Sequence, residues 1–258
     1  MACFAGVDVG SSAAKAVVID DRAEVLGRGL APSGADLAGS AARVLYEACR
    51  EAGVGRERVV RVAATGFGRL NVDFANLRRT EIDCHGRGAY HYFPRAITVV
   101  DIGGQDNKII RLNEKGQRLS FSMNRKCAAG TGAFLEELAL RLKIPLEKLA
   151  ELAARGKPDA TSLGSFCTVF AMTEVLSKIR AGVAVEDLAR AALVSVAKRV
   201  LEAQLINGEV VASGGVVAHQ PLLVEILEDL LKVKVQVPPF AQFTGALGAA
   251  LAAREAES

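Results

Sequence analysis

The chain of 258 residues has no long apolar run, and none approaches the roughly 18 residues that a membrane-spanning helix needs. Its first ten residues, MACFAGVDVG, carry neither the basic region nor the apolar region of an export signal. The formal net charge of +3 is spread along the chain without a basic stripe. These absences predict a cytoplasmic protein with no membrane and no nucleic acid among its partners.

Cysteine is scarce and irregularly spaced. The five thiols, Cys3, Cys49, Cys84, Cys127 and Cys167, are odd in number, and no two of them form a CxxC pair. In a cytoplasmic chain this spacing argues against a disulfide framework and leaves reduced thiols or metal ligands. Core packing is the better interpretation for Cys3 and Cys49, and a structural role for the Cys84-His85 pair.

Two common nucleotide-binding motifs are missing. The chain has no G-x-x-x-x-G-K-[ST] segment, which excludes a P-loop protein. The segment GTGAFL, residues 130–135, has two of the three glycines of G-x-G-x-x-G and lacks the third. A nucleotide site therefore has to come from another arrangement.

Two segments of the chain resemble each other. DVGSSAAKAVV, residues 8–18, and DIGGQDNKIIR, residues 101–111, share Asp, Gly and Lys at identical spacing, with branched apolar residues around them. Both lie in a strand–turn–strand context, so we interpret them as an internal duplication. A duplicated unit predicts two similar domains with a ligand between them.

The hydrophobic pattern predicts an α/β fold. Apolar runs that end in turn residues predict strands at 3–10, 15–20, 23–30, 58–66, 96–104, 107–112, 118–124, 209–215 and 232–237. Apolar residues at helical spacing predict helices at 37–52, 131–142, 167–180, 185–205, 221–231 and 245–253.

Each repeat places an acidic residue at the end of an apolar strand, followed by glycine and small polar residues. Backbone N–H groups in such a turn point at phosphate oxygens, and glycine lets the chain approach closely. Asp8 and Asp101 would lie on either side of a cleft and hold Mg²⁺ through water. The alternative is that each Asp only caps a hairpin. A later glycine pair, SGG at 213–215, favours the nucleotide site.

The ordered set DVGSSAAK, DIGGQDNK, GTG and SGGV resembles the sugar kinase, heat-shock chaperone and actin superfamily. The resemblance implies duplicated actin-like (ribonuclease H-like) domains that clamp Mg-ATP or Mg-ADP in a cleft, with domain I at 1–95 plus 243–258 and domain II at 96–242. Asp101 or Gln105 would orient the attacking water. The nucleotide-binding residues would be Asp8, Gly10, Ser11, Ser12, Lys15, Gly103, Gly104, Gln105, Asp106, Gly130, Thr131, Gly132, Ser213, Gly214, Gly215, Val216 and Gln242.

Cys127 and Cys167 each precede a predicted helix. A helix N-terminus lowers the pKa of a thiol and stabilises an anionic site. Two thiolates do not complete a tetrahedral zinc or iron–sulfur site, whereas a two-fold dimer would bring four. The alternative is that both are buried apolar residues at helix starts.

The segments MNRKCAAGTGAFLE, CTVFAMTEV, DIGGQDNK and FTGALGAAL resemble the ATP-dependent activators of 2-hydroxyacyl-CoA dehydratases, a family that includes ATPase subunits of benzoyl-CoA reductase. The resemblance implies a homodimer that shares one [4Fe–4S] cluster, held by Cys127 and Cys167 of each chain. ATP hydrolysis would then drive a low-potential electron to a dehydratase, a reductase or a related iron–sulfur protein. Ferredoxin or flavodoxin would supply the electron.

Two other functions stay open. A small-molecule kinase of the same superfamily would need a catalytic base, for which Asp106 or Glu136 is available, and an ATP-gated scaffold would need no redox centre. Arg125 and Met172 depart from the family pattern close to the two cluster cysteines, where they would tune the potential or fit a different partner.

Overall fold

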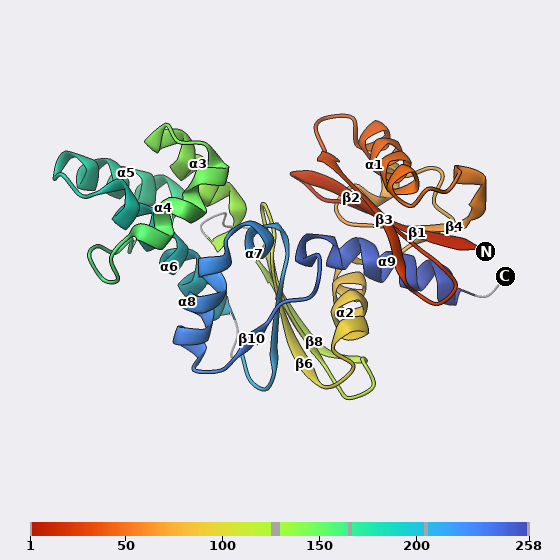
Figure 1. Ribbon diagram of the computed structural model, residues 1–258. Coiled ribbons are helices and arrows are strands. Elements are labelled where there is room, and N and C mark those ends of the chain that lie inside the picture. Colours follow the sequence, from red (N-terminus) through yellow and green to blue (C-terminus); the bar gives the residue numbers. More distant parts are fainter. Residues whose placement is uncertain (1, 125–129, 165–166, 204–205, 257–258) are drawn as a thin grey trace. The chain divides into compact units, whose positions relative to one another are not determined.

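A computed structural model describes residues 2–124, 130–164, 167–203 and 206–256 (Figure 1). The chain divides into two compact units. The first unit comprises Met1–Val99, Ile110–Ser120 and Pro238–Ser258, and the second comprises Val100–Ile109 and Phe121–Val237. The domain bounds predicted from the sequence, and the cleft between the two domains, stay predictions.

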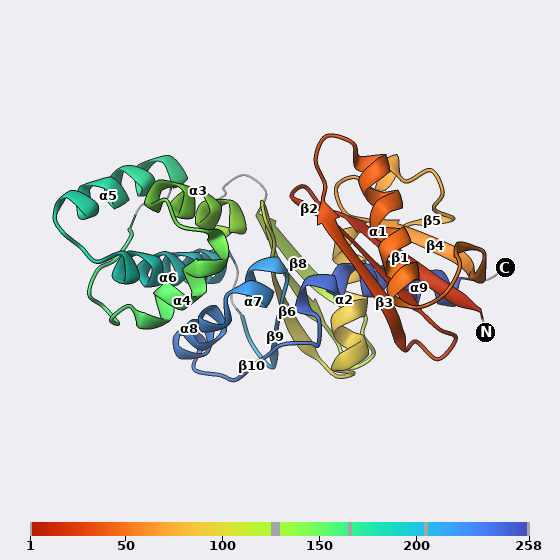
Figure 2. The ribbon, with the colours of Figure 1, turned by 45° about the horizontal axis from the view of Figure 1, so that its top comes forward.

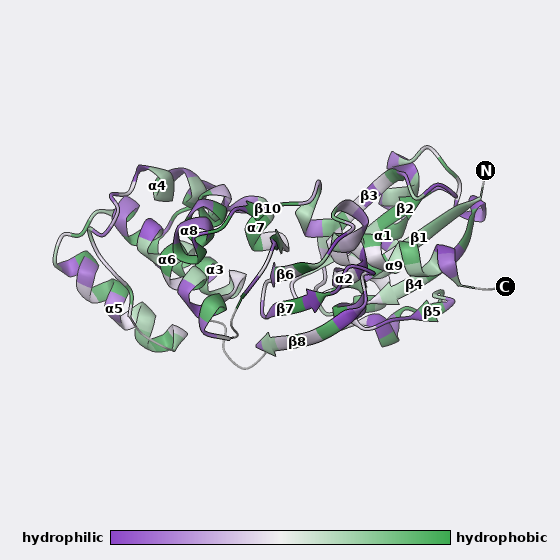
Figure 3. Ribbon diagram, turned by 90° about the horizontal axis from the view of Figure 1, so that it is seen from below, coloured by the Kyte–Doolittle hydropathy of each residue, from purple (hydrophilic) through white to green (hydrophobic). Residues whose placement is uncertain are grey.

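The first unit contains a mixed five-stranded sheet in the order β3-β2-β1-β4-β5. Its central strand β1 pairs antiparallel with β2 and parallel with β4, and it is buried along almost its whole length. Figure 3 shows β1 and β4 as largely hydrophobic ribbons, as expected of strands covered on both faces. The strands are β1 (Cys3–Val9), β2 (Ala13–Ile19), β3 (Val25–Pro32), β4 (Val59–Thr65) and β5 (Leu77–Arg78).

Alternation along β1 directs its side chains to two different helices. Cys3, Ala5, Val7 and Val9 belong to one hydrophobic cluster with the apolar face of α1 (Leu37–Glu51). Gly6 lies on the opposite face, where α9 (Thr244–Glu255) packs so closely that a Cβ on Gly6 would fall 2.0 Å from the carbonyl oxygen of Ala246. Asp8 shares the face of Gly6 by the same alternation, so α9 brings its first turn to the Asp8 carboxylate.

The second sheet repeats the order of the first. Read from its last strand, it runs β8-β7-β6-β9-β10, which matches β3-β2-β1-β4-β5 position by position. The repeated segments of the sequence occupy equivalent strands, β1–β2 and β6–β7. The strands are β6 (Ile97–Ile102), β7 (Asn107–Leu112), β8 (Arg118–Asn124), β9 (Val210–Ser213) and β10 (Val235–Gln236).

Residues 97–99, 110–112 and 118–120 of this sheet belong to the first unit, and the remainder of the sheet belongs to the second. Outside its strands, the second unit is helical. Helices α3, α4, α5 and α6 pack together as a group, and α8 joins it through α6 and α4 (Figure 2). The short α7 follows β9 directly. The bounds are α3 (Gly132–Leu142), α4 (Leu149–Arg155), α5 (Thr168–Arg180), α6 (Val185–Ala203), α7 (Gly215–His219) and α8 (Pro221–Leu231). Among the described residues, no helix is long and apolar enough to cross a membrane.

Most predicted elements are confirmed, and the exceptions have physical reasons. The helix α2 (Glu81–Tyr92) was not predicted, because its buried face includes Gly86, Gly88 and Ala89 in place of large apolar residues at helical spacing. The last strand was predicted at 232–237 and covers only Val235–Gln236, because α8 extends to Leu231 and Lys232 follows in a left-handed conformation. The last two residues of the helix predicted at 185–205 lie outside the described residues.

The contact between α2 and α9 depends on small residues. A Cβ on Gly248 would fall 1.8 Å from the carbonyl oxygen of Cys84, and a Cβ on Gly88 would fall 2.0 Å from that of Thr244. Neither neighbour is a flexible side-chain end that could move aside, so the two helices require glycine at both positions.

We therefore expect Gly248→Ala to lower the free energy of unfolding by at least about 2–3 kcal/mol, because the helices would have to separate. Gly86→Ala is the matched control, since Gly86 is also helical and its Cβ would lie at an ordinary 3.4 Å from Leu112. It should be neutral or stabilise by up to about 1 kcal/mol through helix propensity. Urea unfolding measures both variants, and equal stability for the two would contradict the close packing.

Candidate functional site

The second unit contains a buried cluster of charges at the end of β6. Asp101 is 1% exposed, and it accepts a hydrogen bond from Lys108 Nζ on β7 at 3.1 Å. Lys108 Nζ also donates to Asp106 Oδ1 at 2.7 Å, and Ser213 Oγ donates to Asp101 Oδ1 at 3.0 Å. The ends of three neighbouring strands thus fix one carboxylate, and a buried charge so well paired is costly to disturb.

Glycines keep the space around this carboxylate clear. Gly214 has a left-handed φ of +98°, and a Cβ on it would fall 2.3 Å from the carbonyl oxygen of Ile102 and 2.9 Å from Asp101 Oδ1. A Cβ on Gly103 would fall 2.8 Å from Asp106 Oδ1. Side chains at these two positions would fill the space beside the acidic group, so the backbone stays open to a ligand.

The start of α3 is tied to the turn that follows β6. Gly132 N donates to Gly103 O at 2.9 Å, and Ala133 N donates to Gly104 O at 2.7 Å. The side chain of Asn107 donates to Gly130 O at 3.3 Å. Hydrogen bonds therefore link the glycine segment 130–132 to the turn after β6, which was predicted to bind phosphate.

The first unit carries a corresponding pair at the end of β1. Asp8 is buried, and its Oδ2 lies 3.8 Å from Lys15 Nζ on the paired strand β2. Gly10 N donates to Ala13 O at 3.1 Å, which closes the turn between the strands. A Cβ on Gly10 would fall 3.3 Å from Lys15 Nζ, so glycine again keeps the space beside the ion pair clear.

The correspondence between the units extends to a left-handed glycine. Gly66 follows β4 with φ +86°, and a Cβ on it would fall 2.4 Å from Asp8 Oδ1. In the second unit, Gly214 follows β9 and approaches Asp101 Oδ1 in the same way. Each unit thus combines an Asp on its first strand, a Lys on its second and a left-handed Gly after its fourth.

Sequence reasoning missed several residues of these two groups. Lys108 was not assigned to the site, although it matches Lys15 in the duplication. Gly66 was not assigned either, although the ATG that ends β4 parallels the SGG that ends β9. Gly245 and His85 were not assigned to the site, because α9 and α2 bring them to Asp8 from distant parts of the chain: a Cβ on Gly245 would fall 2.9 Å from both Asp8 Oδ2 and His85 Nε2.

The other predicted nucleotide residues are distributed along the same turns. Ser11, Ser12 and Gln105 are exposed, and Ser12 O accepts from Ser33 N at 3.1 Å. Thr131 is fully buried at the start of α3, and a Cβ on Gly132 would fall 3.2 Å from Val216 Cγ2. Gly215 begins α7, and Gln242 lies in the 3₁₀ turn directly before α9.

The donors of each turn fit a magnesium nucleotide. Exposed hydroxyls and glycine backbone are suited to phosphate oxygens, and carboxylates are the ligands that Mg²⁺ prefers. An ionised carboxylate has about four acceptor sites, so Asp101 retains capacity for a metal-bound water beside its contacts with Lys108 and Ser213. The chemistry of the residues present is therefore compatible with Mg-ATP and Mg-ADP.

Of the two cysteines predicted to bind a cluster, the structure describes only Cys167. Cys127 and Arg125 lie outside the described residues. Cys167 is partly exposed and directly precedes α5, at the positive end of that helix. In the described ranges 2–124, 130–164, 167–203 and 206–256, no three His, Cys, Asp or Glu side chains form a group that could hold a metal ion.

The remaining described cysteines are buried, and burial raises the pKa of the Cys84 thiol to about 12 and also raises that of Cys49. Because the thiolate is the reactive form, we expect iodoacetamide at pH 8 to alkylate Cys167 of the iron-free native protein and to spare Cys3, Cys49 and Cys84. Mass spectrometry of peptides before and after unfolding in urea measures this difference. If iodoacetamide labels Cys84 of the native protein as fast as in urea, the Cys84 thiol is not buried, which contradicts the structure.

Comparisons with known proteins agree with the two-unit architecture. The chain is 41% identical over 254 residues to the activator of lactoyl-CoA dehydratase from Anaerotignum propionicum, covering 97% of each chain. Component A of (R)-2-hydroxyglutaryl-CoA dehydratase from Acidaminococcus fermentans superposes with a TM-score of 0.93 at 37% identity, covering 99% of this chain and 98% of that one. The activator of 2-hydroxyisocaproyl-CoA dehydratase from Clostridium difficile, solved with bound ADPNP, gives 0.91 at 34% identity, covering 98% and 94%.

The predicted duplicated actin-like α/β fold is confirmed by these superpositions and by the repeated strand order. The resemblance stated from the sequence motifs is confirmed as well, since the family match extends over residues 5–253. The chain belongs to the BadF/BadG/BcrA/BcrD ATPase family.

Proposed function

We propose that this chain is an ATP-hydrolysing activator that delivers one low-potential electron to a separate iron–sulfur enzyme. The observation that carries the proposal is the repeated Asp–Lys–Gly arrangement, in a chain that is similar from end to end to dehydratase activators. A relative of the same fold is solved with bound ADPNP, which supports ATP and ADP as the ligands.

In this proposal the two turns bind the phosphates and Mg²⁺. Asp8 and Asp101 hold the metal ion through water, and Lys15 and Lys108 hold the two carboxylates in place. Asp101 or Gln105 orients the attacking water. Gln105 is exposed and sits in the turn between β6 and β7, so it is accessible to a bound nucleotide.

Cys127 and Cys167 of two chains would together hold one [4Fe–4S] cluster. When bound, such a cluster supplies one-electron reduction at low potential. Partial exposure of Cys167 at the start of α5 is compatible with a ligand shared between chains. Met172 on the same helix departs from the family pattern. Its side chain is buried, so it does not lie on the exposed surface beside Cys167.

A homodimer also accounts for the apolar surface beside Cys167. Val169 and Phe170, in the first turn of α5, are 70% and 69% exposed. Adjacent exposed apolar side chains are candidates for a protein–protein contact, and a two-fold contact at α5 would cover them. Four thiolates would then meet on the dimer axis.

The hydrogen bonds at the start of α3 suggest how nucleotide state reaches the cluster ligands. Gly132 and Ala133 are bound to the turn of Gly103 and Gly104, and Cys127 lies three residues before Gly130 in the sequence. A change in the turn on hydrolysis therefore acts on the segment that carries the thiol. A dehydratase or an aromatic-ring reductase would accept the electron, and ferredoxin or flavodoxin would supply it.

Anaerobic purification tests the proposal. The protein should be brown, contain about two iron atoms per chain and have the mass of a dimer, because one four-iron cluster is shared by two chains. A colourless, iron-free protein that phosphorylates a small molecule would instead be a kinase. A cluster-loaded monomer with about four iron atoms per chain would contradict the shared cluster.

A further inference from the structure

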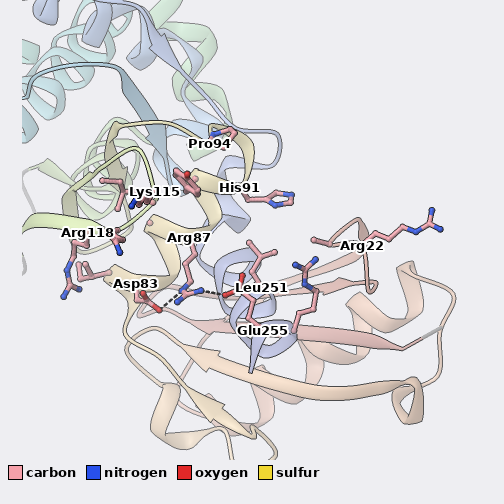
Figure 4. A pocket seen from close by; sticks show the side chains of 17 residues that line it. Arg22, Asp83, Arg87, His91, Pro94, Lys115, Arg118, Leu251 and Glu255 are labelled. Carbon is pink, nitrogen blue, oxygen red and sulfur yellow. Dashed lines mark hydrogen bonds and ion pairs between the residues drawn. The ribbon is translucent and has the colours of Figure 1, made fainter. Parts of the chain in front are cut away.

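The first unit has a groove of about 660 Å³ for which the proposed function provides no role (Figure 4). Its floor is formed by α2 and α9, and its two walls are hairpin turns, one between β2 and β3 and the other between β7 and β8. All of its lining residues belong to the same compact unit.

The lining of the groove is basic. Five of its residues are Arg or Lys, and only Asp83 and Glu255 are acidic. Both acids bind Arg87, at 3.0 Å and 2.5 Å, as the dashed lines in Figure 4 show. The lining therefore carries five basic side chains against two acidic ones, which gives it a net positive charge.

The wall that carries Lys115 and Arg118 is held in place before any ligand binds. Tyr90 donates a hydrogen bond to Glu114 O at 2.7 Å, and Asn113 Oδ1 accepts from the backbone N–H groups of Lys115 and Gln117, both at 2.9 Å. Gly116, with φ +71°, packs against the Tyr90 ring so closely that a Cβ on it would fall 2.8 Å from Tyr90 Cδ1. These contacts fix the conformation of the turn.

The opposite wall is fixed in a similar way. Asp20 Oδ1 accepts from the backbone N–H groups of Arg22 and Glu24, both at 2.9 Å, and Ala23 at the groove edge has φ +68°. In Figure 4, Arg22 lies on one side of the groove, with Lys115 and Arg118 on the other. Preorganised walls reduce the ordering cost of binding a ligand between them.

The floor of the groove adds apolar surface. Ile82, Leu112 and Leu251 line it beside Tyr90. The basic residues lie on four elements, the β2–β3 turn, α2, the β7–β8 hairpin and α9, so a ligand with two or more charged groups can contact more of them than a single small anion can. The apolar floor suits a carbon skeleton between those groups.

We propose that this groove is a second ligand site and that it binds a small organic polyanion carrying two or more phosphate or carboxylate groups. Lys115 of one wall and Arg254 of the floor contact the anionic groups, and Arg87 is the fixed cation of the floor. The site is made of residues distinct from the Asp8 and Asp101 groups.

Calorimetric titration of the full chain tests this site. Mg-ADP is present in excess throughout, so that the proposed nucleotide-binding turns are already occupied. The probes are 2,3-bisphosphoglycerate, which carries phosphates, and citrate, which carries only carboxylates. We expect at least one of them to bind at sub-millimolar concentration, and the one that binds identifies the preferred anionic group. Affinity should fall as salt is added.

Lys115→Ala and Arg254→Ala should each weaken binding about tenfold, because each removes a charge-assisted contact. Arg43→Ala removes an equivalent charge from the exposed face of α1 and should leave the affinity unchanged. Thermal melting of each variant checks that it is folded. Lack of binding by both probes, weaker probe binding at a higher Mg-ADP concentration, or an equal loss of affinity in Arg43→Ala would overturn the proposal.

Discussion

Replacing Asp101 by Asn should lower the rate of ATP hydrolysis by about 10²–10³-fold. The carboxylate is 1% exposed and accepts hydrogen bonds from Lys108 and Ser213, so an amide of the same shape removes a charge that the surrounding donors are arranged to stabilise. The amide also presents an N–H₂ group to one of those donors. Phosphate release by the purified variant under saturating Mg-ATP measures the loss.

Asp20→Asn is the matched control for this change. Asp20 is also a buried carboxylate, at 5% exposed, but it accepts from the backbone of the β2–β3 turn and lies outside the candidate site. It should cost stability and keep the hydrolysis rate per folded molecule. If Asp101→Asn hydrolyses ATP at the wild-type rate while it is correctly folded, Asp101 has no catalytic or metal-binding role.

Cys167→Ser should remove nearly all the iron from the anaerobically purified protein. One substitution per chain removes two of the four ligands of a shared cluster, so Cys127→Ser, Cys167→Ser and the double variant should have equally low iron content. Nucleotide binding should survive in all three, because the described phosphate turns contain no sulfur ligand. Iron is measured colorimetrically and nucleotide binding with a fluorescent ADP.

The buried cysteines supply the control for this experiment. Cys49→Ser and Cys84→Ser should keep the iron content of the wild type, although both place a hydroxyl in an apolar site and should lower stability. Full iron content in Cys167→Ser would contradict the ligand assignment. A variant that has the mass of a dimer but contains no iron would show that the cluster is not needed to hold the two chains together.

Much of the fold was predictable because each unit follows a strong local pattern. Asp8 and Asp101 were found from the sequence because a carboxylate at the end of an apolar strand is unusual, and glycine follows each one. The duplicated strand order also follows from that repeat, since equivalent segments form equivalent hairpins. Local sequence therefore identified the two acidic centres.

Features that depend on distant segments were not predictable. The helix α2 packs through Gly88 against the Thr244 backbone of α9, and small residues give no periodic apolar signal. The same packing brings His85 and Gly245 beside Asp8. The basic groove was also missed, because Arg22, Lys115 and Arg254 are unremarkable surface residues until three elements place them around one floor.

The proposed action of nucleotide state on the redox centre is tested most directly by the rate at which a chelator removes iron. The reduced, anaerobic protein is mixed with bathophenanthroline disulfonate in the presence of Mg-ADP or a non-hydrolysable Mg-ATP analogue. The hydrogen bonds from Gly132 and Ala133 to the phosphate turn predict different rates in the two states. Identical rates, with both nucleotides shown to be bound, would contradict the account.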